Sequence, residues 1–298
     1  MRPDLTVSII SAGNLELLLP CLRSVFESTH RVSLEVYLVD NASTGGTAAA
    51  VEAGFPQVQV LRNEELQGFA TNNNQVLRRG RGRYLMLLND DTLVLPGAFD
   101  RMVQFMDGHP DAGAVGSSCL NPDLSYQQSF SYFPSPWYEG WWTSVDWLYR
   151  VRKKGPQEPK EVDCVSGACM MVRCEVARQV GLLDTAFDPI YAEETDWLFR
   201  IKKGGWKVCT LPGARVIHYG GETMNRTPLR KIELLQAHKA LFFRKHHGPH
   251  AAWFFKVSLM VASALKAMAW LVLMPLKGGT ARAKFKAHWH LAKKALVL

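Results

Sequence analysis

Unbroken apolar runs alternate along the first part of the chain with segments whose apolar residues recur at helical spacing. The strand-like runs are Thr6–Ser11, Leu34–Val39, Val58–Leu61, the run that starts at Tyr84, and Ala112–Ser117. The segments with helical spacing are Leu15–Ser28, Gly46–Ala53, Gly68–Leu77 and Phe99–Met106. Runs without polar alternation are typical of parallel strands that are covered on both faces. The alternation therefore predicts an α/β fold with right-handed crossovers and a mostly parallel sheet flanked by helices.

The run that starts at Tyr84 ends abruptly in Asn89, Asp90 and Asp91. Open α/β sheets bind ligands just outside the carboxyl ends of such strands, so this position favours a functional site. The second strand ends in the same way, in Asp40 and Asn41. The alternative is that these residues only end the strand and cap the helix after Pro96, because Asn and Asp favour turns and caps.

The alternation breaks down after Asn121, where aromatic residues and prolines become frequent. This composition predicts a long, partly ordered loop, which either serves as a lid or binding loop or covers part of the core with its rings. The pattern resumes with a strand over Val162–Val172 and a short helix over Glu175–Val180. Two more strands are expected over Lys207–Leu211 and Ala214–His218.

A second acidic cluster, Glu193, Glu194 and Asp196, opens an amphipathic helix. Acids in a first turn complement the helix dipole, which would by itself explain one or two of them. His218 closes the last strand of this region and precedes a glycine pair. A lone histidine is more often structural than a ligand, so its significance depends on its neighbours.

Composition separates the chain into two parts. At 298 residues, 47% of them hydrophobic, it is long enough for one large α/β domain, expected over 1–227, and an appendage over 228–298. Its start has no secretory pattern, so we expect synthesis and residence in the cytoplasm. Its six cysteines form no Cys-x-x-Cys pair, and we expect reduced core residues rather than a zinc site or disulfides.

The positive charge belongs to the appendage. Residues 228–298 contain thirteen Lys and Arg and the single acid Glu233, so they carry +12, and the rest of the chain carries −4. Beside apolar stretches, such a block favours an anionic membrane surface over nucleic acid, and we expect no nucleic-acid partner.

Two helices are expected in this basic region, over Leu229–His247 and over the apolar stretch Val257–Leu276. Twenty helical residues would just span about 30 Å of hydrocarbon. Lys266 near the middle would cost roughly 2.5–3.5 kcal/mol there, so a helix that lies in the membrane interface is favoured. The alternative is an ordinary helical subdomain packed on the rest of the protein.

Five short motifs occur in a fixed order. They are Val39-Asp40-Asn41-Ala42-Ser43, Asn63 with Gly68-Phe69-Ala70, Leu88-Asn89-Asp90-Asp91-Thr92, Glu193-Glu194-Thr195-Asp196, and His218-Tyr219-Gly220-Gly221. The set resembles glycosyltransferase family 2, most closely its rhamnosyltransferase-like members, over about Thr6 to Thr223. The resemblance implies a GT-A fold and an inverting transfer of a hexose from a dTDP- or UDP-linked sugar to a glycan or lipid-linked acceptor. It also implies a role in cell-surface polysaccharide synthesis at the inner face of the cell membrane.

The resemblance also implies residue roles on the donor side. Asp40 would accept a hydrogen bond from the imide nitrogen of a uracil or thymine base, and Asp91 and His218 would bind a divalent cation, Mn²⁺ or Mg²⁺, at the donor diphosphate. The remaining donor-binding candidates are Asn41, Asn63, Gly68, Asn89 and Asp90. Here the family's metal-binding triplet begins with an amide, Asn89, so fewer carboxylates face the cation.

On the acceptor side, the resemblance makes Glu194 the base that deprotonates the acceptor hydroxyl. Glu193 and Asp196 are its rivals, and Asp196 would orient the acceptor or pair with Arg200 four residues on. Two alternatives stay open. One is an inactive protein that binds nucleotide sugars, and the other is a sugar nucleotidyltransferase, although the first turn, Ser11-Ala12-Gly13-Asn14-Leu15, is not a glycine-rich phosphate loop.

Overall fold

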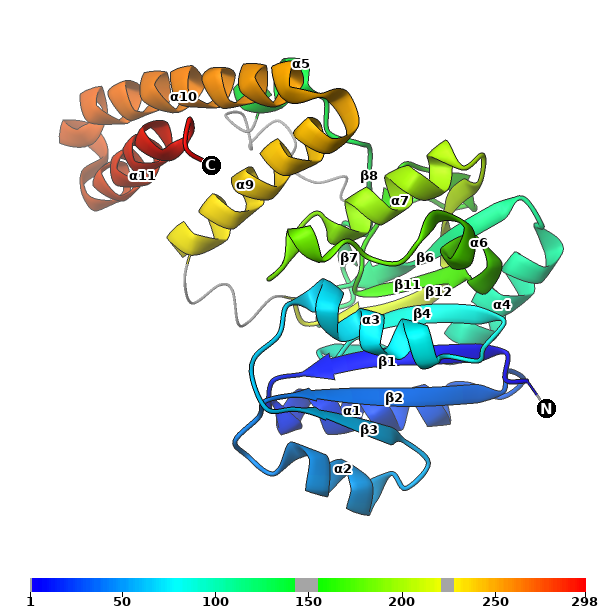
Figure 1. Cartoon of the computed structure of the whole chain (residues 1–298). Helices are drawn as coiled ribbons and strands as arrows, with labels where there is room; N and C mark the ends of the chain where they lie inside the picture. The colour runs from blue at the N-terminus through cyan, green and yellow to red at the C-terminus, as the bar shows by residue number, and fades with distance from the viewer. Residues whose placement is uncertain (1, 143–154, 221–227) are drawn as a thin grey trace. The chain divides into compact units, whose positions relative to one another are not determined.

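The computed structural model describes residues 2–142, 155–220 and 228–298 (Figure 1). The chain divides into two compact units. The first comprises Met1–Phe133 and Arg152–Gly220, and the second comprises Pro134–Val151 and Gly221–Leu298. The boundary expected after residue 227 falls at the segment 221–227, which lies outside the described residues, as does Gly221 of the last motif.

A mixed, mostly parallel sheet forms the centre of the first unit. Its strands are β1 (Leu5–Ser11), β2 (Leu34–Asn41), β3 (Gln59–Asn63), β4 (Tyr84–Asn89), β5 (Thr92–Val94), β6 (Ala112–Leu120), β7 (Tyr126–Gln127), β9 (Lys160–Glu161), β11 (Cys169–Arg173) and β12 (Lys207–His218). The order across the sheet is β3-β2-β1-β4-β11-β6-β12-β5, with β7 beside β6 and β9 beside β12. Strands β3, β2, β1 and β4 are parallel, as are β6 and β12, which confirms the predicted fold class.

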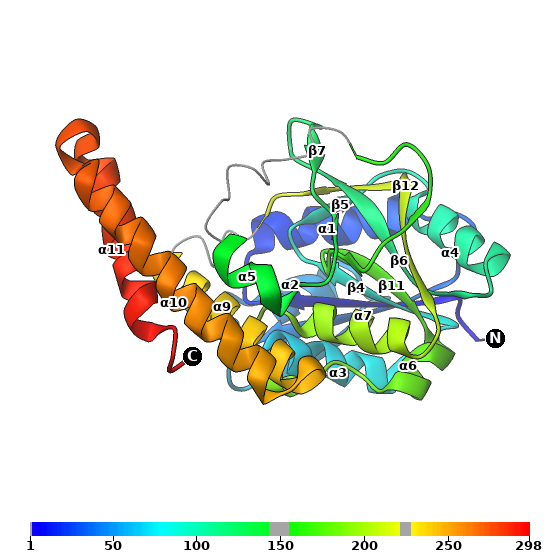
Figure 2. The ribbon, with the colours of Figure 1, turned by 90° about the horizontal axis from the view of Figure 1, so that it is seen from above.

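Helices cover both faces of the sheet (Figure 2). One face carries α1 (Leu15–Glu27), α2 (Thr47–Gly54) and α4 (Ala98–Gly108), and the other carries α3 (Phe69–Arg79), α6 (Cys174–Val180) and α7 (Glu193–Lys203). In the central strand β4, Met86 and Leu88 pack on the first face while Leu85 and Leu87 pack on the second. The apolar run is unbroken because both of its faces are buried.

Several element boundaries differ from the sequence-based expectation. The strand expected over Val162–Val172 is two strands, β10 (Cys164–Val165) and β11, and β10 pairs with β8 (Phe130–Ser131) outside the main sheet. Val165 of β10 packs directly on Gly116 of β6, where a Cβ on the glycine would lie 2.4 Å from the Val165 Cβ. The two strands expected at the end of the region are one, β12, with an irregular register between Leu211 and Arg215.

The segment after Asn121, expected as a partly ordered loop, contains the short elements β7, β8 and β9 and the helix α5 (Pro136–Trp142). The part of it over 143–154 lies outside the described residues. All six cysteines are buried and free, as expected.

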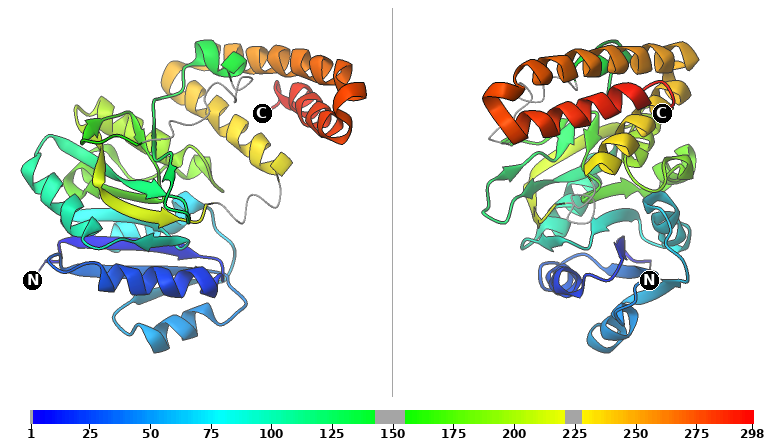
Figure 3. Two further views of the ribbon diagram at one scale, coloured as in Figure 1. Left: turned by 180° about the vertical axis from the view of Figure 1, so that it is seen from behind. Right: turned by 90° about the vertical axis from the view of Figure 1, so that its left-hand side faces the viewer.

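The second unit is helical. It contains α5, α9 (Pro228–His247), α10 (Pro249–Val272) and α11 (Met274–Lys294), and α10 packs against the other three. Figure 3 shows α10 in orange beside α11 in red. The apolar helix expected over Val257–Leu276 therefore starts earlier and ends earlier. Helix α11 follows almost at once and is kinked near its start at Gly278, whose backbone angles are non-helical.

Candidate active site

The candidate site residues gather at one edge of the sheet, because parallel strands end at the same edge. Ser11 of β1 is in register with Asp40 of β2, and the preceding residue of β1 is in register with Asn89 of β4. Neighbouring strands lie about 4.8 Å apart, so β1 alone separates the acids of β2 from those that follow β4. At the other end of the strand order, His218 of β12 is in register with Thr92 of β5. Thr92 directly follows Asp91 in the sequence.

Asp91 and His218 lie in direct contact. His218 Nε2 is 3.3 Å from Asp91 Oδ1, and the Asn89 amide nitrogen lies 3.3 Å from the same ring nitrogen. The other carboxylate oxygen of Asp91 accepts a hydrogen bond from the Gly220 N–H at 3.1 Å. Burial alone would raise the pKa of Asp91, but His218 and the Gly220 N–H hold it below its ordinary value, so the carboxylate stays ionised.

Gln127 fixes the orientation of the His218 ring. The Gln127 amide nitrogen donates to the His218 carbonyl at 3.0 Å and to the Asn121 side-chain oxygen at 3.1 Å. Its amide oxygen therefore faces His218 Nδ1, 2.6 Å away, and Nδ1 must be the donor. Gln127 lies in the segment expected as a loop, and nothing in its sequence position signalled this contact.

In a neutral His218 ring, Nε2 accepts a hydrogen bond from the Asn89 amide, and the same nitrogen faces a carboxylate oxygen of Asp91. That oxygen, Asp91 Oδ1, is buried and has no hydrogen-bond partner among the described residues. A positive charge beside it, either a ring proton or a cation, would satisfy it. A ligand histidine whose other ring nitrogen donates to an oxygen is the usual arrangement at metal sites. The pair thus fits a divalent cation, although no group of three His, Cys, Asp or Glu side chains suited to a metal occurs in the described part of the chain.

Asp90 lies in the turn between β4 and β5, on the side toward β1. Burial and the negative charge of Asp91 raise the pKa of Asp90 to about 6, although a hydrogen bond with Ser11 works in the opposite direction. Of the two adjacent acids, Asp91 faces His218 and Asp90 faces Ser11.

Asp40 and the amides near it hold the loops at the ends of β2 and β3. Asp40 Oδ1 accepts from the Ser43 N–H at 3.1 Å. The Asn41 side chain exchanges two hydrogen bonds with the backbone of Gln67, at 2.9 and 3.0 Å, and Asn63 donates to the Asn41 oxygen at 3.1 Å. The amides of Asn41 and Asn63 therefore have internal partners that shape the loop before Gly68.

Gly68 lies against Asp188, which comes from a distant part of the chain. Asp188 accepts a hydrogen bond from the Ala70 N–H at 2.9 Å and thus caps the start of α3. A Cβ on Gly68 would lie 2.1 Å from the Asp188 carboxyl carbon, so only glycine fits here.

We expect Gly68→Ala to lower the free energy of unfolding by about 1–3 kcal/mol, because the added methyl group overlaps Asp188. Chemical denaturation followed by circular dichroism measures the change. Gly45→Ala is the matched control, since nothing lies within 4 Å of a Cβ there. Equal stabilities of the two variants would show that the close approach is not needed.

The second acidic cluster opens α7 after two residues with left-handed backbone angles, Tyr191 (φ 84°) and Ala192 (φ 70°). Such angles cost non-glycine residues about 1 kcal/mol or more each, and they cluster at functional sites. Glu193 and Glu194 each have a buried carboxylate oxygen without a hydrogen-bond partner among the described residues. Burial raises the pKa of both carboxyls, and their mutual repulsion raises that of Glu193 further.

Asp196 has a different environment. It is fully buried, and it accepts a hydrogen bond from Arg200 Nε at 2.9 Å, which is the ion pair that the four-residue spacing predicted. Arg200 also donates to the backbone oxygens of Val180 and Leu182. The Asp196 carboxylate thus stabilises the loop after α6.

Glu194 lies beside Gly167, which belongs to the segment that precedes β11. A Cβ on Gly167 would lie 3.9 Å from the Glu194 carboxyl carbon. The next residue, Ala168, accepts a hydrogen bond from the Asn89 N–H at 3.0 Å. The two acidic clusters therefore share one edge of the sheet, with the short segment before β11 between them.

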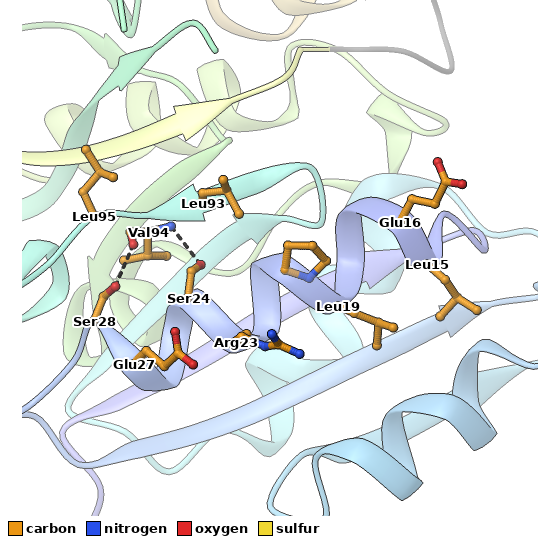
Figure 4. A pocket seen from close by; sticks show the side chains of 11 residues that line it. Leu15, Glu16, Leu19, Arg23, Ser24, Glu27, Ser28, Leu93, Val94 and Leu95 are labelled. Carbon is orange, nitrogen blue, oxygen red and sulfur yellow. Dashed lines mark hydrogen bonds between the residues drawn. The ribbon is translucent and has the colours of Figure 1, made fainter. Parts of the chain in front are cut away.

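A separate groove of about 610 Å³ lies between α1 and β5 (Figure 4). Its walls combine apolar side chains, four of them leucines, with polar and charged ones. Ser24 accepts a hydrogen bond from the Val94 N–H at 2.9 Å, and Ser28 donates one to the Val94 carbonyl at 2.7 Å. These bonds satisfy backbone groups of the edge strand, which protects it from pairing with another chain. None of the candidate site residues lines this groove.

Comparisons with known proteins identify the family of the chain. The model of the family described as glycosyl transferase family 2 matches residues 6–181, more than half of the chain. An N-acetylglucosaminyl-diphospho-decaprenol L-rhamnosyltransferase of Mycobacterium tuberculosis is 27% identical over 250 residues, which cover 76% of this chain and 80% of that protein. An O-antigen biosynthesis protein of Myxococcus xanthus is 24% identical over 222 residues, which cover 73% of this chain and 17% of that protein.

Among solved structures, a mannosyltransferase of Pyrobaculum calidifontis in complex with GDP-Man and Mn²⁺ superposes with a TM-score of 0.61 and 21% identity. The match covers all of this chain and 86% of that protein. At this identity the likeness concerns the fold, which is that of the GT-A glycosyltransferases.

Proposed function

The chain belongs to glycosyl transferase family 2, and we propose that it transfers a hexose, such as rhamnose, from a nucleotide-diphosphate sugar to a lipid-linked or glycan hydroxyl. The observation that carries the proposal is the meeting of Asp91 and His218 at the sheet edge that Glu194 also reaches. The relative from Mycobacterium tuberculosis supports a lipid-linked acceptor, because its name specifies a diphospho-decaprenol. Such an acceptor would place the reaction in cell-surface polysaccharide synthesis, at the inner face of the cell membrane.

On the donor side, Asp40 binds the imide N–H of a uracil or thymine base, which favours dTDP- and UDP-sugars. Asn41, Asn63 and Gly68 act indirectly, through the shape of the loop before α3. Asp91 and His218 would hold a divalent cation, Mn²⁺ or Mg²⁺, with Asn89 and Asp90 beside them. When bound, the cation supplies positive charge that stabilises the departing diphosphate.

On the acceptor side, the Glu194 carboxylate accepts the proton of the acceptor hydroxyl as its oxygen attacks the anomeric carbon. The new bond forms on the face opposite the leaving diphosphate, so the configuration at this carbon inverts. Burial suits this role, because a raised pKa makes the carboxylate a stronger base. Asp196, which is bound by Arg200, keeps α7 and the loop after α6 in place.

Gln127 positions His218 for the cation. We expect Gln127→Met to weaken Mn²⁺ binding by about 10- to 100-fold, because the ring loses the acceptor that fixes its orientation. Electron paramagnetic resonance of free Mn²⁺ measures the affinity without any substrate. Gln128→Met, at a neighbouring exposed glutamine, is the control and should bind Mn²⁺ nearly normally. Unchanged Mn²⁺ affinity in Gln127→Met would show that Gln127 does not position His218 for the cation.

Incubation of the purified protein with UDP-, dTDP- and GDP-sugars and Mn²⁺ tests the proposed function. We expect release of nucleoside diphosphate from a dTDP- or UDP-sugar. Turnover of GDP-sugars alone would overturn the role given to Asp40, although the transfer reaction itself would stand.

A further inference from the structure

Helix α10 exposes an uncharged apolar face along much of its length. Val261, Leu265, Met268 and Val272 have exposed fractions of 36%, 57%, 63% and 76%. At about 100° per residue these four side chains fall within roughly 60° of one another around the helix. We call them the apolar stripe. Contiguous exposed apolar surface of this kind marks an interaction site on a soluble protein.

The opposite side of α10 is the one that packs within the helical unit. Its buried residues are Ala251, Ala252, Phe255, Ser258, Leu259, Ala262, Ser263 and Ala267, and the helix contacts α5, α9 and α11. The two charged residues of α10, Lys256 and Lys266, lie about 140° from Val261 on either side. No charge therefore interrupts the apolar stripe.

Helix α11 carries a stripe of different chemistry. Arg282, Lys286, Trp289 and Lys293 are exposed and recur at the spacing of one helix face. We call them the basic stripe. Cations interleaved with tryptophan on one face, next to a helix with an exposed apolar face, are typical of helices that lie in the headgroup region of a bilayer.

We propose that α10 and α11 form an in-plane anchor for an anionic lipid bilayer. The apolar stripe of α10 enters the boundary between headgroups and acyl chains, and the basic stripe of α11 binds lipid phosphates. This proposal does not depend on the reaction proposed above, and its test requires no sugar transfer.

The geometry favours an anchor in the membrane plane over a span. By length and composition alone, α10 could cross a membrane. However, α11 packs alongside it (Figure 3), so a span would bring the cations of α11 into hydrocarbon or separate the two helices. An in-plane position leaves the basic stripe and both lysines of α10 within reach of water.

Charge also favours lipid over a second copy of the chain. A dimer through the apolar stripe would bury the stripe, but it would bring together two segments that each carry +12. An anionic bilayer matches both the apolar and the basic stripe.

Flotation of the full chain with vesicles provides the first test. We expect binding to phosphatidylcholine vesicles that contain phosphatidylglycerol and much weaker binding to pure phosphatidylcholine vesicles. The double variant Leu265→Glu/Met268→Glu should partition at least about tenfold less. The matched control is Leu124→Glu/Leu229→Glu, which adds the same charge at exposed leucines elsewhere and should bind nearly as the unmodified protein does, since the net charge is still positive.

Spin labels at single introduced cysteines provide the second test, and they are selective because the native cysteines are buried. For an in-plane helix, labels at Val261, Leu265, Met268 and Val272 report one shared depth, and a label at Lys256 is shallower. A steady change of depth from Val257 to Val272 would mean a span and would overturn the in-plane anchor. Unchanged flotation of the double variant, with loss of a dimer by light scattering, would assign the apolar stripe to a second copy instead.

Discussion

Asp91→Asn is expected to lower the rate of sugar transfer by about a thousandfold or more. The substitution keeps the shape of the side chain but removes the charge that faces His218 Nε2 at 3.3 Å. A cation at a transferring diphosphate contributes several kcal/mol, and each 1.36 kcal/mol is a factor of ten in rate. Steady-state transfer and Mn²⁺ affinity should therefore fall together.

Asp90→Asn is the matched control for this experiment. Its carboxylate faces Ser11 rather than His218, so we expect a smaller loss of Mn²⁺ affinity. Full turnover of the unmodified protein in excess EDTA, after metal removal has been verified, would contradict the role of Asp91.

Glu194→Gln is expected to lower transfer by roughly 100-fold or more, which is the usual contribution of a general base. The amide keeps the size of the side chain against Gly167, so donor and Mn²⁺ affinities, measured by calorimetry, should hardly change. The proton moves only during attack, and the loss therefore belongs to the transition state.

The control is Glu193→Gln, which should lose much less, because adjacent side chains on a helix point about 100° apart. The pH profile provides an independent readout. A base works only when deprotonated, and burial raises the Glu194 pKa above its ordinary 4.5, so transfer by the unmodified protein should rise with pH through that raised value. Near-normal transfer by Glu194→Gln, together with an inactive Glu193→Gln, would identify Glu193 as the base instead.

Local sequence patterns were enough to predict the α/β layers. The burial of β4 on both faces leaves an unbroken apolar run, and strands of this kind carry their polar ends to one edge. The Asp196–Arg200 ion pair could also be predicted, because it depends only on four-residue spacing within one helix. The proximity of Asp91 and His218 was predicted from the family resemblance instead, since no local pattern relates residues so far apart.

Other features depend on contacts that no local pattern encodes. Strand β11 is antiparallel between β4 and β6, and its apolar sequence is equally compatible with a parallel strand. Gln127 orients His218 from a short strand inside a segment whose composition suggested a loop. Gly68 fits against Asp188, which is 120 residues away, and the sequence shows only a glycine before a helix.

The most direct measurement is transfer by the purified full chain from dTDP- and UDP-sugars to a lipid-linked N-acetylglucosaminyl diphosphate, with Mn²⁺, followed by NMR of the product. We predict a new glycosidic bond whose anomeric configuration is inverted relative to the donor, and loss of this product in Asp91→Asn and Glu194→Gln. A product with retained configuration, or equal product yields from both variants and the unmodified protein, would contradict metal-assisted, base-catalysed inversion at this site.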